Sequence, residues 1–346
     1  MLTLNRIIKL KMSRHLLLTV AAICFGMLVT ISAQADAQIR DGYLQREDVQ
    51  AFIGNMVSKH GFKRSQLEGL FAAIEPKPGI IESISHPAEA KPWYKYRPIF
   101  IQESRITGGV DFWNKHVNIL ERAEKQYGVP AEIIVAIIGV ETRYGHYTGR
   151  HKVFESLVTL GFDYPKRGRF FRNELSQYLI LTREEGIDPL SLKGSYAGAM
   201  GMPQFISSSY RRYAVDFDGD GKRDLHNNIS DVIGSVANYF KVHGWQAGDP
   251  VISRATVAAN ARIAVIPDSL KPALTLEELK RLGVTSTNSV TGNPKASLIS
   301  LEQPNAMEYW LGFKNFYVIT RYNHSPLYAM AAYQLAELIR SRRQDS

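Results

Sequence analysis

The sequence predicts a mainly α-helical protein of the α+β class, with a small β-containing insert late in the chain. Apolar residues recur at helical spacing through most of residues 47–243. After about residue 247, short β-prone runs alternate with loops rich in Gly, Ser, Thr and Asn. The composition, 45% hydrophobic and 22% charged over 346 residues, is typical of a soluble globular protein long enough for more than one domain.

The first 35 residues have the order of an export signal. Four basic residues precede the apolar run 16–32, and Ala33-Gln34-Ala35 offers a small-x-small cleavage site. We expect cleavage; the alternative is an uncleaved anchor, for which the apolar run is at the short end. Cys24, the one cysteine, lies in this segment, so we expect a mature chain without disulfides, thiol catalysis or Cys-ligated zinc.

The charge balance decides little. The formal charge of +9 falls to +5 when the four basic signal residues are left out, which suits a polyanionic wall polymer, a membrane surface or an ordinary solvated exterior. No dense Lys/Arg patch is interleaved with aromatic residues, so we do not expect a nucleic-acid partner.

The helical periodicity places elements in the following order. Gly128 ends one long helix and Pro130 begins the next, which delivers Glu141. Residues 91–98 are predicted to form an extended, aromatic-rich connector. Besides the helix from Pro130 to Glu141, helices are predicted over 47–60, 65–74, 109–128, 154–160, 170–185, 229–243, 276–282 and 326–339, and β-prone runs over 251–257, 263–266, 296–301, 309–311 and 316–319.

Glu141 is the first candidate for chemistry. It closes the run 131–138, which is apolar on every face past its first turn, as in a helix buried in a core. Burial raises the pKa of a carboxyl toward the range where it donates a proton near neutral pH, as glycosidic cleavage requires. Taken alone, the residue favours the other interpretation, because most Glu residues near helix ends are solvated or paired, here with Arg143; the neighbouring motifs change that balance.

Residues 193–205 form a second candidate. Its glycines let the backbone approach another group closely, and Ser195 and Gln204 supply neutral hydrogen-bonding groups. The stretch is either a tight turn packed on a helix or one wall of a sugar groove.

Residues 216–224 have the pattern of an EF-hand calcium loop. Asp216, Asp218 and Asp220 stand at positions one, three and five, a glycine stands at six, and the carbonyl of Lys222 stands at seven. Position twelve is Asn227 rather than Glu, so Asp231 is the candidate for the closing carboxylate. An acidic surface turn is the alternative. Because neither a His-Glu-x-x-His element nor a phosphate loop is present, we expect a structural metal.

Several of these motifs, in this order, resemble the lytic murein transglycosylase B family of bacterial cell-wall enzymes. The resemblance covers about residue 94 to the C-terminal helix. It rests on Gly139-Val140-Glu141-Thr142-Arg143, on residues 194–201, on the Asp216 loop, and on residues 234–240 and 320–325.

The resemblance implies a lysozyme-like core with a helical domain and a small β-domain. The corresponding division assigns residues 1–35 to the signal peptide and residues 36–108, with helix 326–340, to an N-terminal helical region. Residues 109–246 form the lysozyme-like catalytic core with the EF-hand-like loop, residues 247–318 form the small β-containing domain, and residues 319–346 return to the helical body. It also implies cleavage of the β-1,4 bond between N-acetylmuramic acid and N-acetylglucosamine without water. Glu141 would protonate the leaving oxygen and then accept the proton of the muramyl 6-hydroxyl, which closes onto C1 and leaves a 1,6-anhydro end.

Carried over by position, the resemblance implies a substrate groove and a structural Ca²⁺ site, with no organic cofactor. It further implies peptidoglycan glycan strands as the partner, and we expect a periplasmic monomer. Membrane association stays open because the context of Cys24 departs from a lipid-anchor site. The groove residues are Ser195, Gln204, Tyr239, Tyr322, Asn323, Tyr328 and Tyr96; the metal residues are Asp216, Asp218, Asp220, Lys222 and Asp231.

Two other functions stay open from the residues. A hydrolysing muramidase or chitinase would use a second carboxylate, for which Glu155, Asp163 and Glu174 are the candidates. A wall-binding scaffold protein would bind peptidoglycan without any catalytic carboxylate.

Overall fold

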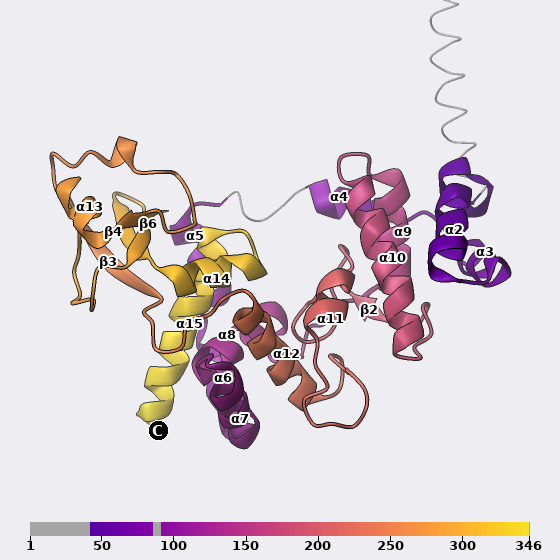
Figure 1. Ribbon diagram of the computed structural model, residues 1–346, viewed down its shortest axis with the longest axis horizontal. Coiled ribbons are helices and arrows are strands. Elements are labelled where there is room, and N and C mark those ends of the chain that lie inside the picture. The colour runs from indigo at the N-terminus through magenta and orange to yellow at the C-terminus, as the bar shows by residue number, and fades with distance from the viewer. Residues whose placement is uncertain (1–41, 86–90, 346) are drawn as a thin grey trace, which may run out of the picture. The chain divides into compact units, whose positions relative to one another are not determined.

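The computed structural model describes residues 42–85 and 91–345 (Figure 1). The predicted export signal and Cys24 lie outside these residues. The chain divides into two compact units, Met1–Pro76 and Lys77–Ser346. None of the helices in the described ranges combines the length and the hydropathy that crossing a membrane requires.

The first unit is a small helical cluster. Its elements are the 3₁₀ turn η1 (Tyr43–Gln45) and the helices α2 (Glu47–His60) and α3 (Arg64–Ala72). Gly61, with φ 66°, ends α2 in the left-handed conformation that glycine adopts without strain. Phe52 of α2 and Phe71 of α3 pack edge to face, with ring centroids 6.0 Å apart.

The second unit is built around α8 (Ala131–Thr142), which is apolar all round and almost wholly buried. Four helices pack against α8: α6 (Glu103–Lys115), α7 (Val117–Tyr127), α12 (Ile229–Val242) and the C-terminal α15 (Pro326–Gln344). The remaining helices are α4 (Pro78–Ser85), α5 (Trp93–Phe100), α9 (Val153–Asp163), α10 (Gly168–Glu184), α11 (Ser207–Tyr213), α13 (Leu276–Arg281) and α14 (Lys314–Tyr322).

A five-stranded antiparallel sheet follows the helical part. Its strands are β3 (Ile252–Val257), β4 (Leu274–Thr275), β5 (Val284–Ser286), β6 (Lys295–Glu302) and β7 (Met307–Gly312), in the order β4-β6-β7-β3-β5. Leu279, Val284 and Leu311 form the centre of its own small core. A separate pair, β1 (His151–Lys152) with β2 (Lys193–Gly194), joins the start of the glycine-rich stretch to the chain before α9.

The predicted fold class, mainly helical with a small β-containing part, is confirmed. The division of the chain into the domains expected from the sequence stays a prediction.

Four local predictions were wrong. Residues 91–98 are not extended: they form most of α5, because Trp93 and Tyr96 lie one turn apart and are both buried. The run 316–319 lies in α14, and 263–266 contains the 3₁₀ turn η3 (Ile263–Val265). Short apolar runs fit a strand and a helix equally well, so the hydrophobic pattern alone does not distinguish the two conformations. The predicted helix 109–128 is two helices, since the backbone leaves helical geometry at His116 with φ −121°.

Candidate functional site

Glu141 occupies the last turn of α8, where the helix reaches the protein surface. Arg143 caps the helix in the left-handed conformation, with φ 50°. Gly139 lets Tyr144 fold back against the helix: a Cβ at position 139 would lie 2.4 Å from the Tyr144 hydroxyl oxygen. That hydroxyl donates a hydrogen bond to the Arg105 carbonyl oxygen at 2.6 Å, which fixes the turn that follows Glu141.

Among the residues that the structure describes, the carboxyl of Glu141 has one side-chain hydrogen-bond partner, Tyr328 of α15. The Tyr328 hydroxyl donates to Oε1 of Glu141 at 2.5 Å. Burial raises the pKa of Glu141 from 4.5 to about 7, and the bond from Tyr328 opposes part of this rise. Burial, and after it the charge of Glu141, raises the pKa of Tyr328 well above 10, so Tyr328 remains a donor.

A cavity of about 350 Å³ opens onto this carboxyl. Of the described residues that line it, Glu141 alone carries a carboxyl group. Arg105 directs its guanidinium at the carbonyl oxygens of Gly139, Ile99 and Phe100 and so belongs to the wall. The lining residues are Arg105, Val140, Glu141, Thr142, Arg143 and Tyr147.

Tyr147 and Arg143 were not among the predicted site residues. Tyr147 is 66% exposed at the rim of the cavity, and the Arg143 guanidinium lies 5.4 Å from its ring centroid. An exposed aromatic ring beside a buried acid offers a sugar a stacking face. A tyrosine six residues after the acid was the signal in the sequence that could have identified it.

Three predicted groove tyrosines are brought together next to Glu141. The ring planes of Tyr322 and Tyr328 are nearly parallel, with an interplanar angle of 7° and centroids 6.4 Å apart. The ring centroid of Tyr239 lies 4.8 Å from that of Tyr322. Tyr322 donates its hydroxyl proton to the Pro203 carbonyl oxygen at 2.6 Å, and Tyr239 to that of Arg321 at 2.5 Å. The hydroxyls of Tyr322 and Tyr239 are thus satisfied, and the three rings form a packed aromatic cluster behind Glu141. None of the three is among the described residues that line the Glu141 cavity, so their contact with substrate stays a prediction.

The glycine-rich stretch lies against the end of α8. Thr142, the neighbour of Glu141, donates its hydroxyl to the Met202 carbonyl oxygen at 2.9 Å. Gln204 donates from Nε2 to the carbonyl oxygens of Thr148 (3.0 Å) and Gly201 (2.8 Å). The Ser195 hydroxyl accepts from the backbone N–H groups of Ala199 and Ala197 at 3.0 and 3.3 Å. In this structure both side chains therefore shape the loop, and their contact with substrate stays a prediction.

The two other groove candidates differ in exposure. Asn323 is partly buried and caps the end of α14, directly after Tyr322. Tyr96 is 3% exposed in α5, where its ring packs between Trp93 and Phe100 at 6.4 and 5.1 Å. The substrate roles of both stay predictions.

None of the three rival carboxylates lines the Glu141 cavity among the residues described. Glu155 is within ion-pair range of Lys77 and Lys152, at 3.9 and 4.0 Å. Glu174 is buried in α10 and accepts from the Ser208 N–H at 2.9 Å. Asp163 is the last residue of α9. The cavity therefore presents one acid rather than the pair that a hydrolase of this kind uses.

The acidic loop brings three of its predicted ligands together. One carboxylate oxygen from each of Asp216, Asp218 and Asp231 lies within 4.8 Å of the others. Asp231 is fully buried, and burial, with the charges of Asp218 and Asp216, raises its pKa, as expected where a cation is needed to offset clustered carboxylates. Such an all-oxygen set fits Ca²⁺.

The other two predicted ligands are outside that cluster. Asp220 is exposed and accepts from the Lys222 N–H at 2.9 Å, which shapes the turn. Asp216 accepts three backbone N–H bonds, from Gly219, Asp220 and Gly221, so the loop is folded around its first carboxylate. Ligation by Asp220 and by the Lys222 carbonyl stays a prediction.

A helical core that carries one carboxyl of raised pKa beside a cluster of tyrosine rings is typical of an acid–base enzyme of the lysozyme-like class. Comparison with known proteins identifies its family: the Transglycosylase SLT domain matches residues 44–337, and the chain belongs to this family. The family predicted from the sequence motifs is confirmed.

Three relatives illustrate the similarity. The chain is 42% identical over 312 residues to membrane-bound lytic murein transglycosylase B of Escherichia coli, covering 87% of this chain and 85% of that one. The structure of catenated lytic transglycosylase SltB1 from Pseudomonas aeruginosa matches with a TM-score of 0.83 and 51% identity, over 87% and 99% of the two chains. The E. coli lytic transglycosylase Slt35 in complex with calcium matches with a TM-score of 0.80 and 43% identity, over 86% and 94%.

The raised pKa of Glu141 predicts a pH-dependent stability. Between pH 4.5 and about 7 the folded protein keeps a proton on Glu141 that the unfolded chain has lost, so the free energy of unfolding falls as pH rises through this window. Glu141→Gln removes the effect. The free energies of unfolding of the variant and the parent are measured in urea at pH 5 and at pH 8. From pH 5 to pH 8, we expect the difference, variant minus parent, to rise by at most about 3 kcal/mol.

Glu103→Gln is the control: the pH window of Glu103 lies below its unfolded pKa of 4.5, so between pH 5 and pH 8 this variant should keep the pH dependence of the parent. The bond from Arg342 lowers the pKa of Glu103, so the stability that Glu103 contributes is present at neutral pH and is lost as pH falls. If Glu141→Gln instead loses stability relative to the parent as pH rises, the proposed protonated state of Glu141 is wrong.

Proposed function

We propose that this protein is a lytic transglycosylase that cleaves the β-1,4 bond between N-acetylmuramic acid and N-acetylglucosamine in peptidoglycan, leaving 1,6-anhydromuramyl ends. One observation carries the proposal. The cavity offers a single carboxyl, Glu141, whose pKa of about 7 suits both loss and gain of a proton at neutral pH. The relationship to a lytic murein transglycosylase supports the choice of substrate.

In the first step, protonated Glu141 donates its proton to the glycosidic oxygen as the bond to C1 breaks. The hydrogen bond from Tyr328 occupies Oε1, which leaves Oε2 to face the substrate. As the carboxylate forms, the same bond strengthens, because a hydrogen bond to an ionised acceptor is stronger than one to a neutral acceptor.

In the second step, the Glu141 carboxylate accepts the proton of the muramyl 6-hydroxyl, whose oxygen closes onto C1. The residue returns to its protonated state, so protons balance without water. The tyrosine cluster of Tyr322, Tyr328 and Tyr239 is neutral, so it adds no positive charge that would oppose the one developing at C1.

We also propose the remaining substrate contacts and the structural metal. We assign four further residues to the groove because they match groove residues of the family position by position: Ser195, Gln204, Asn323 and Tyr96. The Asp216, Asp218 and Asp231 carboxylates, with Asp220 and the Lys222 carbonyl, are assigned to Ca²⁺, a choice supported by the calcium complex of Slt35.

For the location of the protein, we propose export to the periplasm and action there as a monomer on glycan strands. The support is the order of basic, apolar and small residues in the first 35 positions. Membrane association is open to test, since the E. coli relative is called membrane-bound.

Glu141→Gln tests the proposal directly. Gln keeps the shape and still accepts from Tyr328 but cannot shuttle a proton, so we expect activity on purified peptidoglycan to fall by roughly 10²- to 10⁴-fold. Mass spectrometry of the wild-type digest should show anhydro-terminated muropeptides. Reducing ends would favour a hydrolase, and an inactive wild type would favour a wall-binding scaffold.

Tyr328→Phe tests the hydrogen bond to Glu141. Because that bond lowers the pKa of Glu141, its loss should move the alkaline limb of the kcat/KM profile to higher pH and reduce kcat by roughly 10- to 100-fold. Tyr322→Phe is the matched control, since its hydroxyl bonds the Pro203 carbonyl, and it should leave that limb in place. Equal shifts in both variants would contradict the role given to Tyr328.

Calcium should stabilise the protein through the acidic loop. We expect millimolar Ca²⁺ to raise Tm in a thermal-unfolding assay and EDTA to reverse the rise. Asp218→Asn removes an exposed member of the carboxylate cluster and should abolish most of the shift, whereas Asp249→Asn, an exposed aspartate outside the cluster, should not. A shift that survives in Asp218→Asn would place calcium elsewhere.

A further inference from the structure

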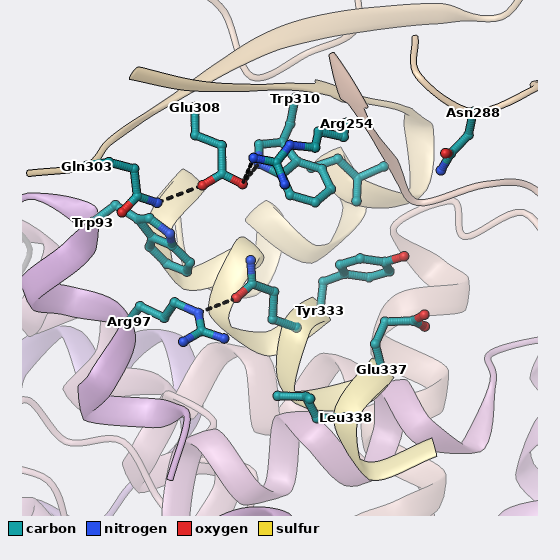
Figure 2. A pocket seen from close by; sticks show the side chains of 12 residues that line it. Trp93, Arg97, Arg254, Asn288, Gln303, Glu308, Trp310, Tyr333, Glu337 and Leu338 are labelled. Carbon is teal, nitrogen blue, oxygen red and sulfur yellow. Dashed lines mark hydrogen bonds and ion pairs between the residues drawn. The ribbon is translucent and has the colours of Figure 1, made fainter. Parts of the chain in front are cut away.

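A second cavity, of about 610 Å³, lies between the sheet and helices α5 and α15 (Figure 2). It has none of its lining residues in common with the Glu141 cavity. Its size is within the range of cavities that bind small ligands. No step proposed for Glu141 uses it.

The sheet side of this cavity is a preorganised polar and aromatic wall. Trp310 of β7 donates its indole N–H to Oε1 of Glu308 at 3.0 Å, and Gln303 donates to Oε2 of Glu308 at 2.6 Å. Arg254 of β3 forms an ion pair with Glu308 at 3.6 Å. The charge of Glu308 is therefore compensated within the wall, and the orientation of the Trp310 ring is fixed (Figure 2).

The helix side supplies a second ring and a cation. Tyr333 of α15 faces the cavity opposite Trp310, and Arg97 of α5 donates from Nε to the amide oxygen of Gln334 at 2.7 Å (Figure 2). Glu337 is paired with Arg340 at 2.6 Å. Among the bonds of the described residues, the partner of Arg97 is thus a neutral amide. Arg97 is therefore the lining cation that no carboxylate of the described residues pairs, although the lining as a whole carries two arginines and two glutamates.

This combination matches a sugar chain that bears carboxylates. Aromatic faces on two walls, together with the side-chain amides that also line the cavity, suit pyranose rings and their hydroxyls. A guanidinium without an anionic partner binds a carboxylate through its forked N–H groups. We propose that this cavity binds a carboxylate-bearing amino-sugar strand, namely a segment of peptidoglycan remote from the bond being cut.

The inference rests on the proposed function and extends it. A remote site adds an attachment point for a polymer but not for a short fragment, so it raises the effective concentration of the strand at Glu141. Its loss should weaken binding to intact peptidoglycan without changing turnover of a short soluble glycan.

The test is carried out in the Glu141→Gln protein, so that binding is measured without cleavage. In pelleting assays with purified peptidoglycan, adding Trp310→Ala should raise the apparent Kd about tenfold, and Trp310→Phe should restore part of the affinity. Tyr309→Ala is the matched control, because alternate residues of a strand point to opposite faces of the sheet and Tyr309 does not line the cavity.

Arg97 separates recognition of charge from recognition of shape. Calorimetry with a soluble peptide-bearing muropeptide tetrasaccharide should show weaker binding for Arg97→Gln than for Arg97→Lys, whereas neutral chitotetraose should bind both equally. Equal pelleting by the Trp310→Ala and Tyr309→Ala proteins would overturn the site. Failure of the proposed function is read separately, from the absence of anhydro products with the wild-type enzyme.

Discussion

The burial of Glu141 is the constraint on which the rest of the structure depends. A carboxyl with a pKa of about 7 requires an apolar surrounding, and α8 supplies it because helices α6, α7, α12 and α15 enclose it. Within the described part of the chain, the side-chain donor to that carboxyl is Tyr328, which comes 187 residues later. The C-terminal helix must therefore return to the core before the acid acquires both its position and its pKa.

A second set of contacts fixes the cavity around that acid. The glycine-rich stretch is bonded to α8 through Thr142 and Met202, to the following turn through Gln204 and Thr148, and to α14 through Tyr322 and Pro203. Each bond joins a side chain to a backbone carbonyl, so the path of the loop is specified by hydrogen bonds rather than by packing alone. Rigid walls of this kind hold reacting groups in place at little entropic cost during the reaction.

The parts of this site that follow from local spacing could be predicted from the sequence. The all-round apolar pattern of α8 placed Glu141 at the end of a buried helix, and the acidic spacing predicted the cluster of Asp216, Asp218 and Asp231. Contacts between distant segments leave no local pattern, so the bond from Tyr328 to Glu141 required the fold. Helices α5 and α14 were missed because tertiary burial of a few aromatic and apolar side chains decided their conformation.

The pKa of Glu141 also explains why one carboxyl suffices. In a two-carboxylate site the environments push the two pKa values apart, so that one group is always the acid and the other the base. A lone residue must hold a proton when the bond breaks and lack it when the ring closes, and a pKa far from neutrality would disable one of these steps. Burial raises the pKa and the Tyr328 hydrogen bond opposes the rise, and their balance near 7 keeps both states accessible. Water is not needed as a reactant, because the substrate carries its own hydroxyl nucleophile.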